Sequence, residues 1–426
     1  MRTDVVVCGA GVGGLAAAHA LGSLGLRVLL VDKLAEPTTA AKGEVLQPGA
    51  LRILSGWGVT RRLQERGALR LSHLVARDPE GRPQMALEYD RLPGEANWLL
   101  AHDYPAILAA LTDGLAPTVD FRRGVLVRGP LRDDTGRISG VTLRLGPDAA
   151  DQDVHAPLVV AADGISSRLR REAGIEVQRQ EYPHRLVAFD IHDAPPTEPD
   201  FSAYVSGRGL RLRYPLPGGR VRLYVQTAPD ELRGLDRDGL LRWTDRLLAE
   251  VPGLAALGDA LPAALDSRQA LPVSRFLAPR LSAPGLALVG ESGHAVHPMA
   301  AQGMNSSVCD AHCLAEAIGA HRGGSGDLDP SGVDTALRAY ASERLSDLAH
   351  VGRTSHNAAR MITDLSWAGR TLGRRAMRHT GANTRLRYTV MHNMAGLGFH
   401  ELSLLDRLHQ IGLLPDPRGR RLPAWA

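Results

Sequence analysis

The sequence predicts an α/β protein in which one α/β domain is interrupted by a β-rich insertion and followed by a helical C-terminal region. A strand, a helix and a second strand follow one another in residues 4–32, which is typical of a parallel sheet with helical crossovers. Apolar and polar residues alternate across residues 210–226 around a Pro-Gly-Gly turn, and this pattern indicates an antiparallel hairpin. From residue 306 onward the pattern is mostly helical.

The first three elements form a βαβ unit. Residues 4–8 (DVVVC) are short, β-branched and bounded by glycine, which is typical of a buried parallel strand. Residues 12–24 are expected to form a helix, and residues 26–32 a second buried strand that ends in Asp32. The elements expected after this unit are an amphipathic helical segment at 44–66, strands at 71–78 and 84–89, a helix beginning at 104–111, and buried strands at 156–164 and 286–290.

These elements divide the 426 residues into three parts. We expect the α/β domain in residues 1–70, 100–175 and 275–350, the β-rich domain in residues 71–99 and 176–274, and the helical region in residues 351–426. The β-rich part is therefore an insertion within the α/β domain and not a separate domain at one end of the chain.

The composition excludes several classes of protein. Runs of about eighteen apolar residues are missing, so we expect no integral membrane segment, and the N-terminus lacks the cleavage site of a signal peptide. The three cysteines, Cys8, Cys309 and Cys313, predict buried free thiols in a cytoplasmic protein, without a disulfide framework or a metal site. The net charge of +4 is small, and the arginine-rich residues 370–387 lack interleaved aromatic residues, so we expect no nucleic-acid binding. Monomer and homodimer both remain open.

A glycine-rich loop joins the first strand to the first helix. It has the pattern G-x-G-x-x-G and consists of Gly9, Ala10, Gly11, Val12, Gly13 and Gly14. The first glycine allows a tight turn, the second lets backbone amides approach a pyrophosphate, and the third lets helix and strand pack closely. Asp32, followed by Lys33, ends the second strand where a carboxylate would bond the hydroxyl groups of an adenosine ribose. The Rossmann-like pattern therefore predicts a dinucleotide site.

A second glycine motif of this kind does not occur in the sequence. The segments that begin at Gly207 and Gly396 both lack the third glycine. Enzymes that bind FAD and NADPH in separate nucleotide-binding domains usually carry two such motifs. One motif at the start of the chain therefore indicates one tightly held nucleotide.

Two later segments have the composition of strand-to-loop turns that present polar groups. In residues 158–171 (LVVAADGISSRLRR) a buried strand runs into Asp163 and Gly164, and Ser167 and Arg168 follow. In residues 286–307 an apolar strand ends abruptly at a glycine and an acid. The residues of that second segment that stand out are Gly290, Glu291, His294, Pro298, Gly303, Met304 and Asn305.

With these three motifs in this order, the chain resembles the flavoprotein monooxygenases of the para-hydroxybenzoate hydroxylase family. The resemblance implies a Rossmann-like FAD-binding domain, in which the segment around Asp163 contacts both FAD and the reduced nicotinamide cofactor. It also implies that the acid after Gly290 accepts hydrogen bonds from the ribityl chain, and that the following loop and the helix beginning near Gly303 direct backbone dipoles at the flavin. The further cofactor contacts that we expect are Lys33, Lys42, Gly43, Tyr104 and Val125.

The chain departs from the family pattern at two positions. The acid after Gly290 is aspartate in the family, whereas Glu291 stands here, and its extra methylene must be absorbed by the loop, the flavin or a water. The family often carries an arginine that touches the FAD phosphates in the segment matching residues 101–111, and this segment contains no arginine. Tyr104 and His102 are the candidates to replace it.

The resemblance implies an NAD(P)H-consuming monooxygenase that uses FAD and O2 to hydroxylate an electron-rich aromatic or quinone- or quinolone-like molecule through a flavin hydroperoxide. The composition, rich in alanine and arginine, indicates a bacterium of high GC content, and for such a bacterium the resemblance implies a role in secondary metabolism. The alternative is a flavin oxidoreductase of the same fold that acts on an isoprenoid or polyketide without oxygen insertion. A halogenase fits less well, because Lys33 and Lys42 are the only lysines and both lie near the start. The Asp163 motif argues against a non-enzymatic FAD-binding regulator.

The β-rich insertion supplies the candidates for substrate binding and for a general base. Strand alternation is expected to place Arg211 and Arg213 on one face of a strand, and Leu210, Leu212 and Tyr214 on the other. The candidates for substrate contact are Arg211, Arg213, Tyr214 and Tyr224, and the further candidates for the base are His184, His192 and Tyr204. One of the two faces should cover the flavin, and the pattern does not say which.

Overall fold

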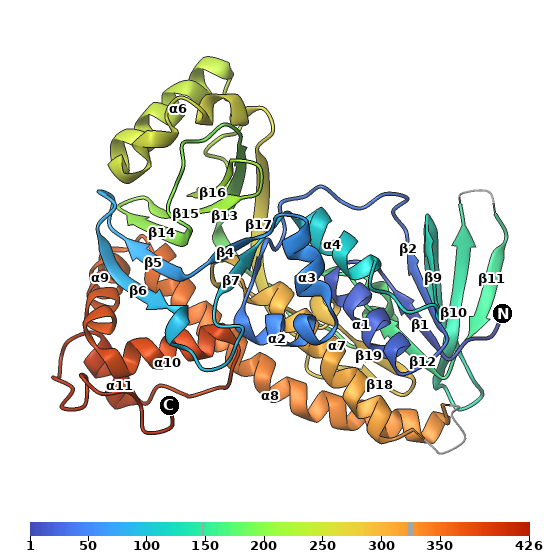
Figure 1. Ribbon diagram of the computed structural model, residues 1–426. Coiled ribbons are helices and arrows are strands. Elements are labelled where there is room, and N and C mark those ends of the chain that lie inside the picture. Colours follow the sequence, from blue (N-terminus) through green and yellow to red (C-terminus); the bar gives the residue numbers. More distant parts are fainter. Residues whose placement is uncertain (147–148, 323–327) are drawn as a thin grey trace.

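Two large sheets organise the fold, and the computed structural model describes residues 1–146, 149–322 and 328–426. Figure 1 shows the six-stranded sheet in one half of the molecule and the eight-stranded sheet in the other. The long helix α8 (Pro330–Thr363) packs against strands of both. The chain therefore has the α/β part, the β-rich part and the helical C-terminal part that its periodicities predict.

The six-stranded sheet is parallel except at one edge. Its order is β18-β19-β12-β1-β2-β8, and the antiparallel pair is β18 with β19. The strands are β1 (Val5–Cys8), β2 (Val28–Asp32), β8 (Val119–Arg123), β12 (Leu158–Ala161), β18 (Ser282–Ala283) and β19 (Leu286–Leu288). Helix α1 (Val12–Ser23) packs against this sheet and against α7 (Gln302–Ala320), and α4 (Tyr104–Thr112) packs on α1. Strands β1, β12 and β19 are consequently buried along their whole length, as their continuous apolar runs predict.

An antiparallel three-stranded sheet covers part of this domain and has no counterpart in the sequence expectations. Its order is β11-β10-β9, and its strands are β9 (Val125–Arg132), β10 (Ile138–Leu145) and β11 (Asp151–His155). Val141 and Val154 belong to the same buried cluster as the β1 residues. This sheet therefore extends the core of the α/β domain.

The segment expected to be helical at 44–66 consists of a short strand followed by two helices. The strand is β3 (Val45–Leu46), and the helices are α2 (Pro48–Gly56) and α3 (Val59–Glu65). Pro48 is a favourable first residue for α2, and Gly58 separates the helices because its φ of 69° is incompatible with a continuous helix. Strand β3 forms a small sheet with β7 (Leu99–Ala101), which also pairs with β4 (Leu69–Leu71).

The eight-stranded sheet is antiparallel except where β14 runs parallel to β5. Its order is β20-β17-β13-β16-β15-β14-β5-β6. The strands are β5 (His73–Arg77), β6 (Pro83–Glu88), β13 (Gln180–Ile191), β14 (Asp200–Ser206), β15 (Gly209–Leu216), β16 (Arg220–Thr227), β17 (Gln269–Leu277) and β20 (His294–Ala295). Strands β15 and β16 form the hairpin that the Pro-Gly-Gly turn predicts, with Leu216 beside Arg220.

The two faces of this sheet are buried against different partners. Helix α6 (Arg237–Glu250) covers the outer face, where Trp243 stacks on Phe189 with ring centroids 5.9 Å apart. The inner face carries Leu212 and Tyr214, which share a cluster with Met299 from the other half of the molecule. The inner face is therefore the one that meets the α/β domain.

The C-terminal helices pack against the β-rich half of the molecule. They are α9 (Trp367–Ala382), α10 (Thr384–Ala395) and α11 (Leu404–Gln410), and both α9 and α10 contact β6. Helix α8 and strand β17 each run across an expected domain boundary, at residues 350 and 274. None of the helices in the described part of the chain combines the length and the apolar composition that a membrane crossing requires.

Gly14 is predicted to be required for folding. A Cβ at this position would lie 1.7 Å from the carbonyl oxygen of Gly9, so α1 could not approach β1 as it does. We expect Gly14→Ala to lower the free energy of unfolding by about 1–3 kcal/mol, measured by urea denaturation of the flavin-free protein.

The matched control is Gly319→Ala on α7, where a Cβ would lie 3.7 Å from Leu24, in ordinary van der Waals contact. That substitution should leave the free energy of unfolding unchanged or raise it slightly. Equal stability of the two variants would contradict the role assigned to Gly14.

Candidate functional site

A cavity of about 520 Å³ lies where the carboxyl ends of the parallel strands face the inner side of the eight-stranded sheet. Its lining includes residues that follow β1, β12 and β19, and it also includes residues of β13, β14, β15 and β16. Ligands of open α/β sheets bind at this carboxyl edge. The cavity therefore has one wall from each half of the molecule.

The glycine loop forms one end of the cavity. Gly9 has a φ of 108°, which allows the tight turn after β1, and its N–H continues the ladder to the neighbouring strand β2 by donating to the carbonyl of Val31 over 2.7 Å. Gly11 is the N-cap of α1, and no side chain caps this helix terminus. The amides of the first turn of α1 can therefore bind an anion such as a pyrophosphate.

Asp32 is held rigidly at the end of β2. The N–H of Ala10 donates to one carboxylate oxygen over 2.6 Å, and the N–H of Leu34 donates to the other over 2.7 Å. Asp32, Lys33 and Arg123 all line the cavity. Arg123 lies at the end of the adjacent strand β8, beside Asp32, and was not among the expected contacts. Arg123 is the last residue of β8, a strand that was not among the expected elements.

Asp163 carries an acceptor that is left without a partner. One oxygen accepts hydrogen bonds from the N–H groups of Arg168, at 2.8 Å, and Leu169, at 3.3 Å, which caps α5 (Arg168–Glu172). The other oxygen, Oδ1, is buried without a hydrogen bond to any described residue, and Asp163, Gly164 and Arg168 line the cavity. A buried unpaired carboxylate oxygen is costly, so a ligand hydroxyl that donates to it would be stabilising. This orphaned acceptor and the uncapped glycine loop fit a polyhydroxylated dinucleotide such as FAD.

Glu291 forms an ion pair across the cavity. It lies in the single 3₁₀ turn Gly290–Ser292 (η4), and its carboxylate accepts a hydrogen bond from Lys42 Nζ over 2.5 Å. Burial lowers the pKa of Lys42, but the carboxylate raises that pKa by more, so the net shift is upward. Glu291 therefore neither caps α7 nor pairs with an arginine.

A buried carboxylate with three hydrogen-bond donors lies behind this turn. Asp310 on α7 accepts hydrogen bonds from Gly290 N–H at 2.9 Å, from His294 Nε2 at 2.7 Å and from Arg344 Nε at 3.0 Å. Burial raises the pKa of Asp310, but His294 and Arg344 lower it by more. The carboxylate therefore holds the turn that presents Glu291. Sequence reasoning missed Asp310, although a lone acid among small residues of a helix was visible.

The loop after Glu291 reaches the cavity through some of its residues only. Pro298, Gly303 and Met304 line the cavity, and α7 begins there without a side-chain cap. Asn305 does not line it, because its side chain accepts from Gln47 N–H at 2.7 Å and donates to the carbonyl of Val45 at 3.2 Å. Asn305 thus joins the loop to β3 and does not line the cavity.

Of the remaining residues expected to contact the cofactor, some line the cavity and others do not. Gly13, Val12, Gly43, Tyr104 and Val125 line the cavity, and the Tyr104 hydroxyl is the atom nearest to a Cβ built on Gly11, at 3.4 Å. Gly14 is buried behind the loop, and the ring of His102 contacts the carbonyl of Arg66. Tyr104 and not His102 therefore occupies the place beside the glycine loop.

The opposite wall is apolar and aromatic. It consists of Leu186, Phe201, Leu212, Tyr214 and Tyr224. The rings of Phe201 and Tyr214 stack with centroids 5.1 Å apart. Burial raises the pKa of Tyr214 and of Tyr224. Strand alternation turns Arg211 and Arg213 to the other face, where they pair with Glu250 and Asp200, so neither arginine lines the cavity.

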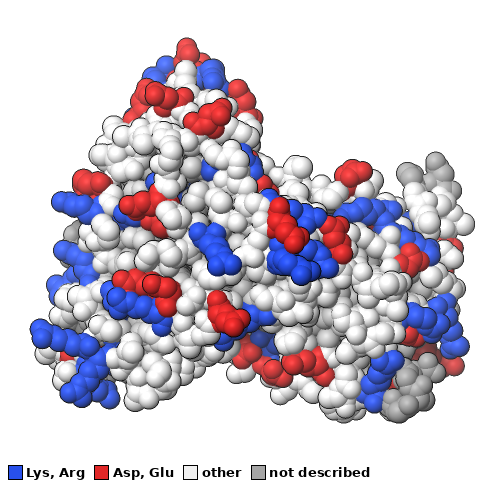
Figure 2. All heavy atoms as spheres, in the orientation of Figure 1, with Lys and Arg blue, Asp and Glu red and all other residues white. Residues whose placement is uncertain are grey.

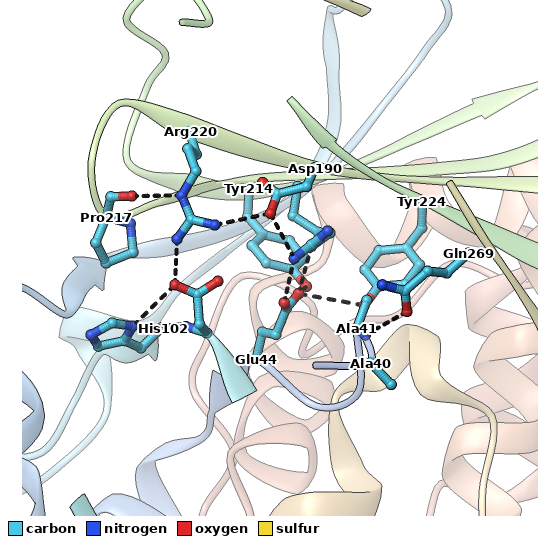
Figure 3. A network of polar contacts seen from close by, with 12 residues as sticks. Ala40, Ala41, Glu44, His102, Asp190, Tyr214, Pro217, Arg220, Tyr224 and Gln269 are labelled. Atoms are coloured by element: carbon cyan, nitrogen blue, oxygen red, sulfur yellow. Dashed lines mark hydrogen bonds and ion pairs between the residues drawn. The ribbon is translucent and has the colours of Figure 1, made fainter. Parts of the chain in front are cut away.

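Glu44 lies under this wall and was missed from the sequence. Figure 3 shows its carboxylate among Tyr214, Tyr224 and an arginine. The carboxylate accepts two hydrogen bonds from Arg222, at 2.9 and 2.8 Å, one from Tyr214 at 2.7 Å and one from Tyr224 at 3.4 Å. Arg222 and Tyr224 lie two residues apart on one strand, and this spacing was the available signal for the network.

The other candidates for a general base lie away from this cavity. His184 is buried with its Nε2 3.0 Å from Nε2 of His297, His192 is exposed, and Tyr204 packs on the outer face of the sheet. Among the candidates drawn from the sequence, Tyr214 and Tyr224 are those that line the cavity.

Comparison with known proteins adds the family. The sequence pattern of the FAD binding domain family matches residues 2–353. The chain is 31% identical over 312 residues to 6-methylpretetramide 4-monooxygenase of Streptomyces rimosus, and this match covers 73% of each chain. It is 28% identical over 166 residues, 39% of the chain, to 3-demethoxyubiquinol 3-hydroxylase of Escherichia coli, which covers 41% of that protein.

Solved structures agree with this assignment. The structure of P. aeruginosa PqsL in complex with 2-aminobenzoylacetate matches with a TM-score of 0.72 and 25% identity, covering 86% of this chain and 98% of the other. The anhydrotetracycline hydroxylase OxyS from Streptomyces rimosus shares the fold, with a TM-score of 0.71 and 22% identity over 95% of this chain and 78% of that one. The chain belongs to the FAD-binding-domain family of flavoprotein monooxygenases, and it is an FAD-dependent monooxygenase.

Proposed function

We propose that this monooxygenase hydroxylates an electron-rich, multi-ring aromatic small molecule of secondary metabolism, at the expense of NAD(P)H and O2. The observation that carries the proposal is the single cavity that joins the glycine loop and Glu291 to the aromatic wall of Phe201, Tyr214 and Tyr224. The relatives that act on 6-methylpretetramide and anhydrotetracycline support oxygen insertion into an aromatic polyketide. They do not favour the alternative of an oxidoreductase that leaves oxygen out.

The residues around the cavity are assigned to the parts of FAD by their chemistry. The first turn of α1 would bind the pyrophosphate, Asp32 the adenosine ribose, and the free oxygen of Asp163 a hydroxyl group. Glu291, whose carboxylate is held by its hydrogen bond from Lys42, would accept hydrogen bonds from the ribityl chain. The uncapped start of α7, at Gly303 and Met304, would favour negative charge on the part of the ring that it faces.

When bound, FAD supplies the reduction by NAD(P)H and the activation of oxygen, and the protein supplies binding, orientation and exclusion of water. The aromatic wall would hold the flat face of the substrate by stacking and apolar contact. Tyr214 is fixed by its hydrogen bond to Glu44, so it would orient a substrate hydroxyl without moving. A fixed orientation of the reacting carbon toward the cofactor is the main contribution that such a wall can make.

The activity is tested with purified, FAD-loaded protein and a panel of phenols, quinones, quinolones and tetracycline-type aromatic polyketides. We expect one class to accelerate NAD(P)H oxidation and to yield a product that carries one oxygen atom from isotopically labelled O2. If NAD(P)H oxidation is accelerated and the product carries no label, the oxygen-inserting function is contradicted.

Gly11→Val is predicted to abolish FAD binding and to leave the protein folded. The φ of Gly11 is −72°, and only the Tyr104 hydroxyl lies within 4 Å of a Cβ at this position, so the protein itself tolerates the change. The valine methyl groups would occupy the space in which the pyrophosphate meets the α1 amides. Circular dichroism should match that of the apo wild type, and the purified variant should be colourless. If the purified variant is yellow and carries FAD stoichiometrically, the assignment of the dinucleotide site to this loop is wrong.

Glu291→Ala is predicted to weaken FAD binding about ten- to hundredfold, which corresponds to the roughly 1–3 kcal/mol lost when ribityl hydroxyls have no charged acceptor. Glu291→Asp retains the carboxylate and should bind FAD within a few-fold of the wild type. Titration of FAD into the apo proteins measures both values. Melting curves with and without FAD are the control, because loss of the Lys42 pair alone would lower both melting temperatures equally. Unchanged affinity of the alanine variant would exclude the ribityl role.

A further inference from the structure

The wall opposite the glycine loop has an electrostatic character that restricts the substrate. Glu44 and Arg222 are both buried, with side chains 2% and 7% exposed. They form a bidentate ion pair, in which the guanidinium donates one hydrogen bond to each carboxylate oxygen. Glu44 lines the cavity and Arg222 does not. The negative partner therefore faces the cavity, and the positive partner lies behind it.

The hydrogen-bonding capacity of this wall is that of an acceptor. Both tyrosine hydroxyls donate their single proton to Glu44, so each has only lone pairs left to offer a ligand. Oε2 of Glu44 already accepts from three donors, whereas Oε1 accepts from Arg222 alone and retains a free lone pair. A ligand that forms a hydrogen bond with this wall must therefore be the donor.

The cationic side chains that line the cavity do not offset the negative charge of this wall, because they have other partners or lie elsewhere. Lys42 is paired with Glu291, and Arg168 is paired with Glu172. Lys33 and Arg123 flank Asp32 at the other end of the cavity. Among the lining residues that the eight-stranded sheet contributes in the described part of the chain, none is cationic.

We propose that Glu44, Tyr214 and Tyr224 are specificity-determining residues that select an uncharged substrate presenting a phenol or enol hydroxyl to this wall, and that they reject substrates with a carboxylate at the same place. A hydroxyl can donate to Tyr214 or to Oε1 of Glu44. A carboxylate would place a second negative charge beside a buried one in a site of low dielectric, which is strongly unfavourable. This inference rests on the proposed function, since it names the substrate class of that site.

Three naphthalenes that share one ring system test the proposal. 2-Naphthol offers a donor, 2-methoxynaphthalene offers an acceptor only, and 2-naphthoate offers a negative charge at the same position. Each is titrated into the oxidised holoenzyme, and binding is measured as the change in the absorbance spectrum of bound FAD, without NAD(P)H. We expect the wild type to bind 2-naphthol at least about tenfold more tightly than either of the other two compounds. Neither of those compounds has a hydroxyl group that can donate a hydrogen bond to the acceptors of the wall.

Two variants assign the preference to named groups. Tyr214→Phe keeps the Glu44–Arg222 pair intact and should weaken 2-naphthol binding without weakening 2-naphthoate binding. Glu44→Gln removes the charge and supplies a donor, so the ratio of 2-naphthoate to 2-naphthol affinity should rise at least about tenfold. The matched control is Tyr204→Phe, whose hydroxyl lies on the outer face of the same sheet and should leave all three affinities unchanged.

The outcomes separate this proposal from the proposed function. Binding is read without turnover, so the expected order of affinities supports the proposal even if no product forms with NAD(P)H and O2. Product formation without the expected order leaves the monooxygenase function in place and overturns the selection. The selection is also overturned by equal affinities, by a preference for 2-naphthoate, by a preference that survives in Tyr214→Phe, or by the absence of any spectral change with all three probes.

Discussion

The buried ion pair between Glu44 and Arg222 is the interaction on which the arrangement of the site depends. It ties the segment between β2 and α2 to the inner face of the eight-stranded sheet, and it removes two charges from water at a place where neither could stay alone. Removal of one partner of such a pair costs several kcal/mol, because the other charge remains buried. The pair continues through Asp190 and Arg220, which Figure 3 shows, to Asp103, and all three side chains are partly exposed.

Other contacts of the same segment depend on that anchor. Within a few residues of Glu44, Lys42 reaches Glu291, and the backbone of Val45 and Gln47 bonds to Asn305. The segment therefore joins the glycine-loop half, the loop after β19 and the β-rich half at one place. Asp310 completes the arrangement from behind, because it holds Gly290 and His294 through one carboxylate. Cofactor-facing and substrate-facing side chains are consequently positioned by one connected set of buried polar contacts.

Charges of both signs are mixed on the face of the molecule that Figure 2 shows. Figure 2 shows Lys and Arg interspersed with Asp and Glu over this face of the molecule, which agrees with the small net charge of +4. Ion pairs of low exposure lie beside the cavity and behind it, as with Glu44–Arg222 and Asp310–Arg344, and also on the outer face of the eight-stranded sheet, as with Arg213–Asp200. Burial places the Glu44–Arg222 and Asp310–Arg344 pairs in surroundings of low dielectric, which strengthens their hydrogen bonds.

The sequence by itself determined the features that depend on local pattern. Glycine spacing and strand periodicity predicted the βαβ unit, the dinucleotide loop, Asp32 and the turn at Asp163, because each is encoded within about thirty residues of chain, the span of one βαβ unit. Alternation predicted the opposite orientations of Arg211 and Tyr214, but not which face would meet the cavity. The tertiary structure decided that point, together with the pairing of Glu44 with Arg222, of Lys42 with Glu291, and of Asp310 with Gly290 and Arg344. Partners 178 and 249 residues apart leave no periodic trace in the sequence, because packing and desolvation bring them together only once both sheets have formed.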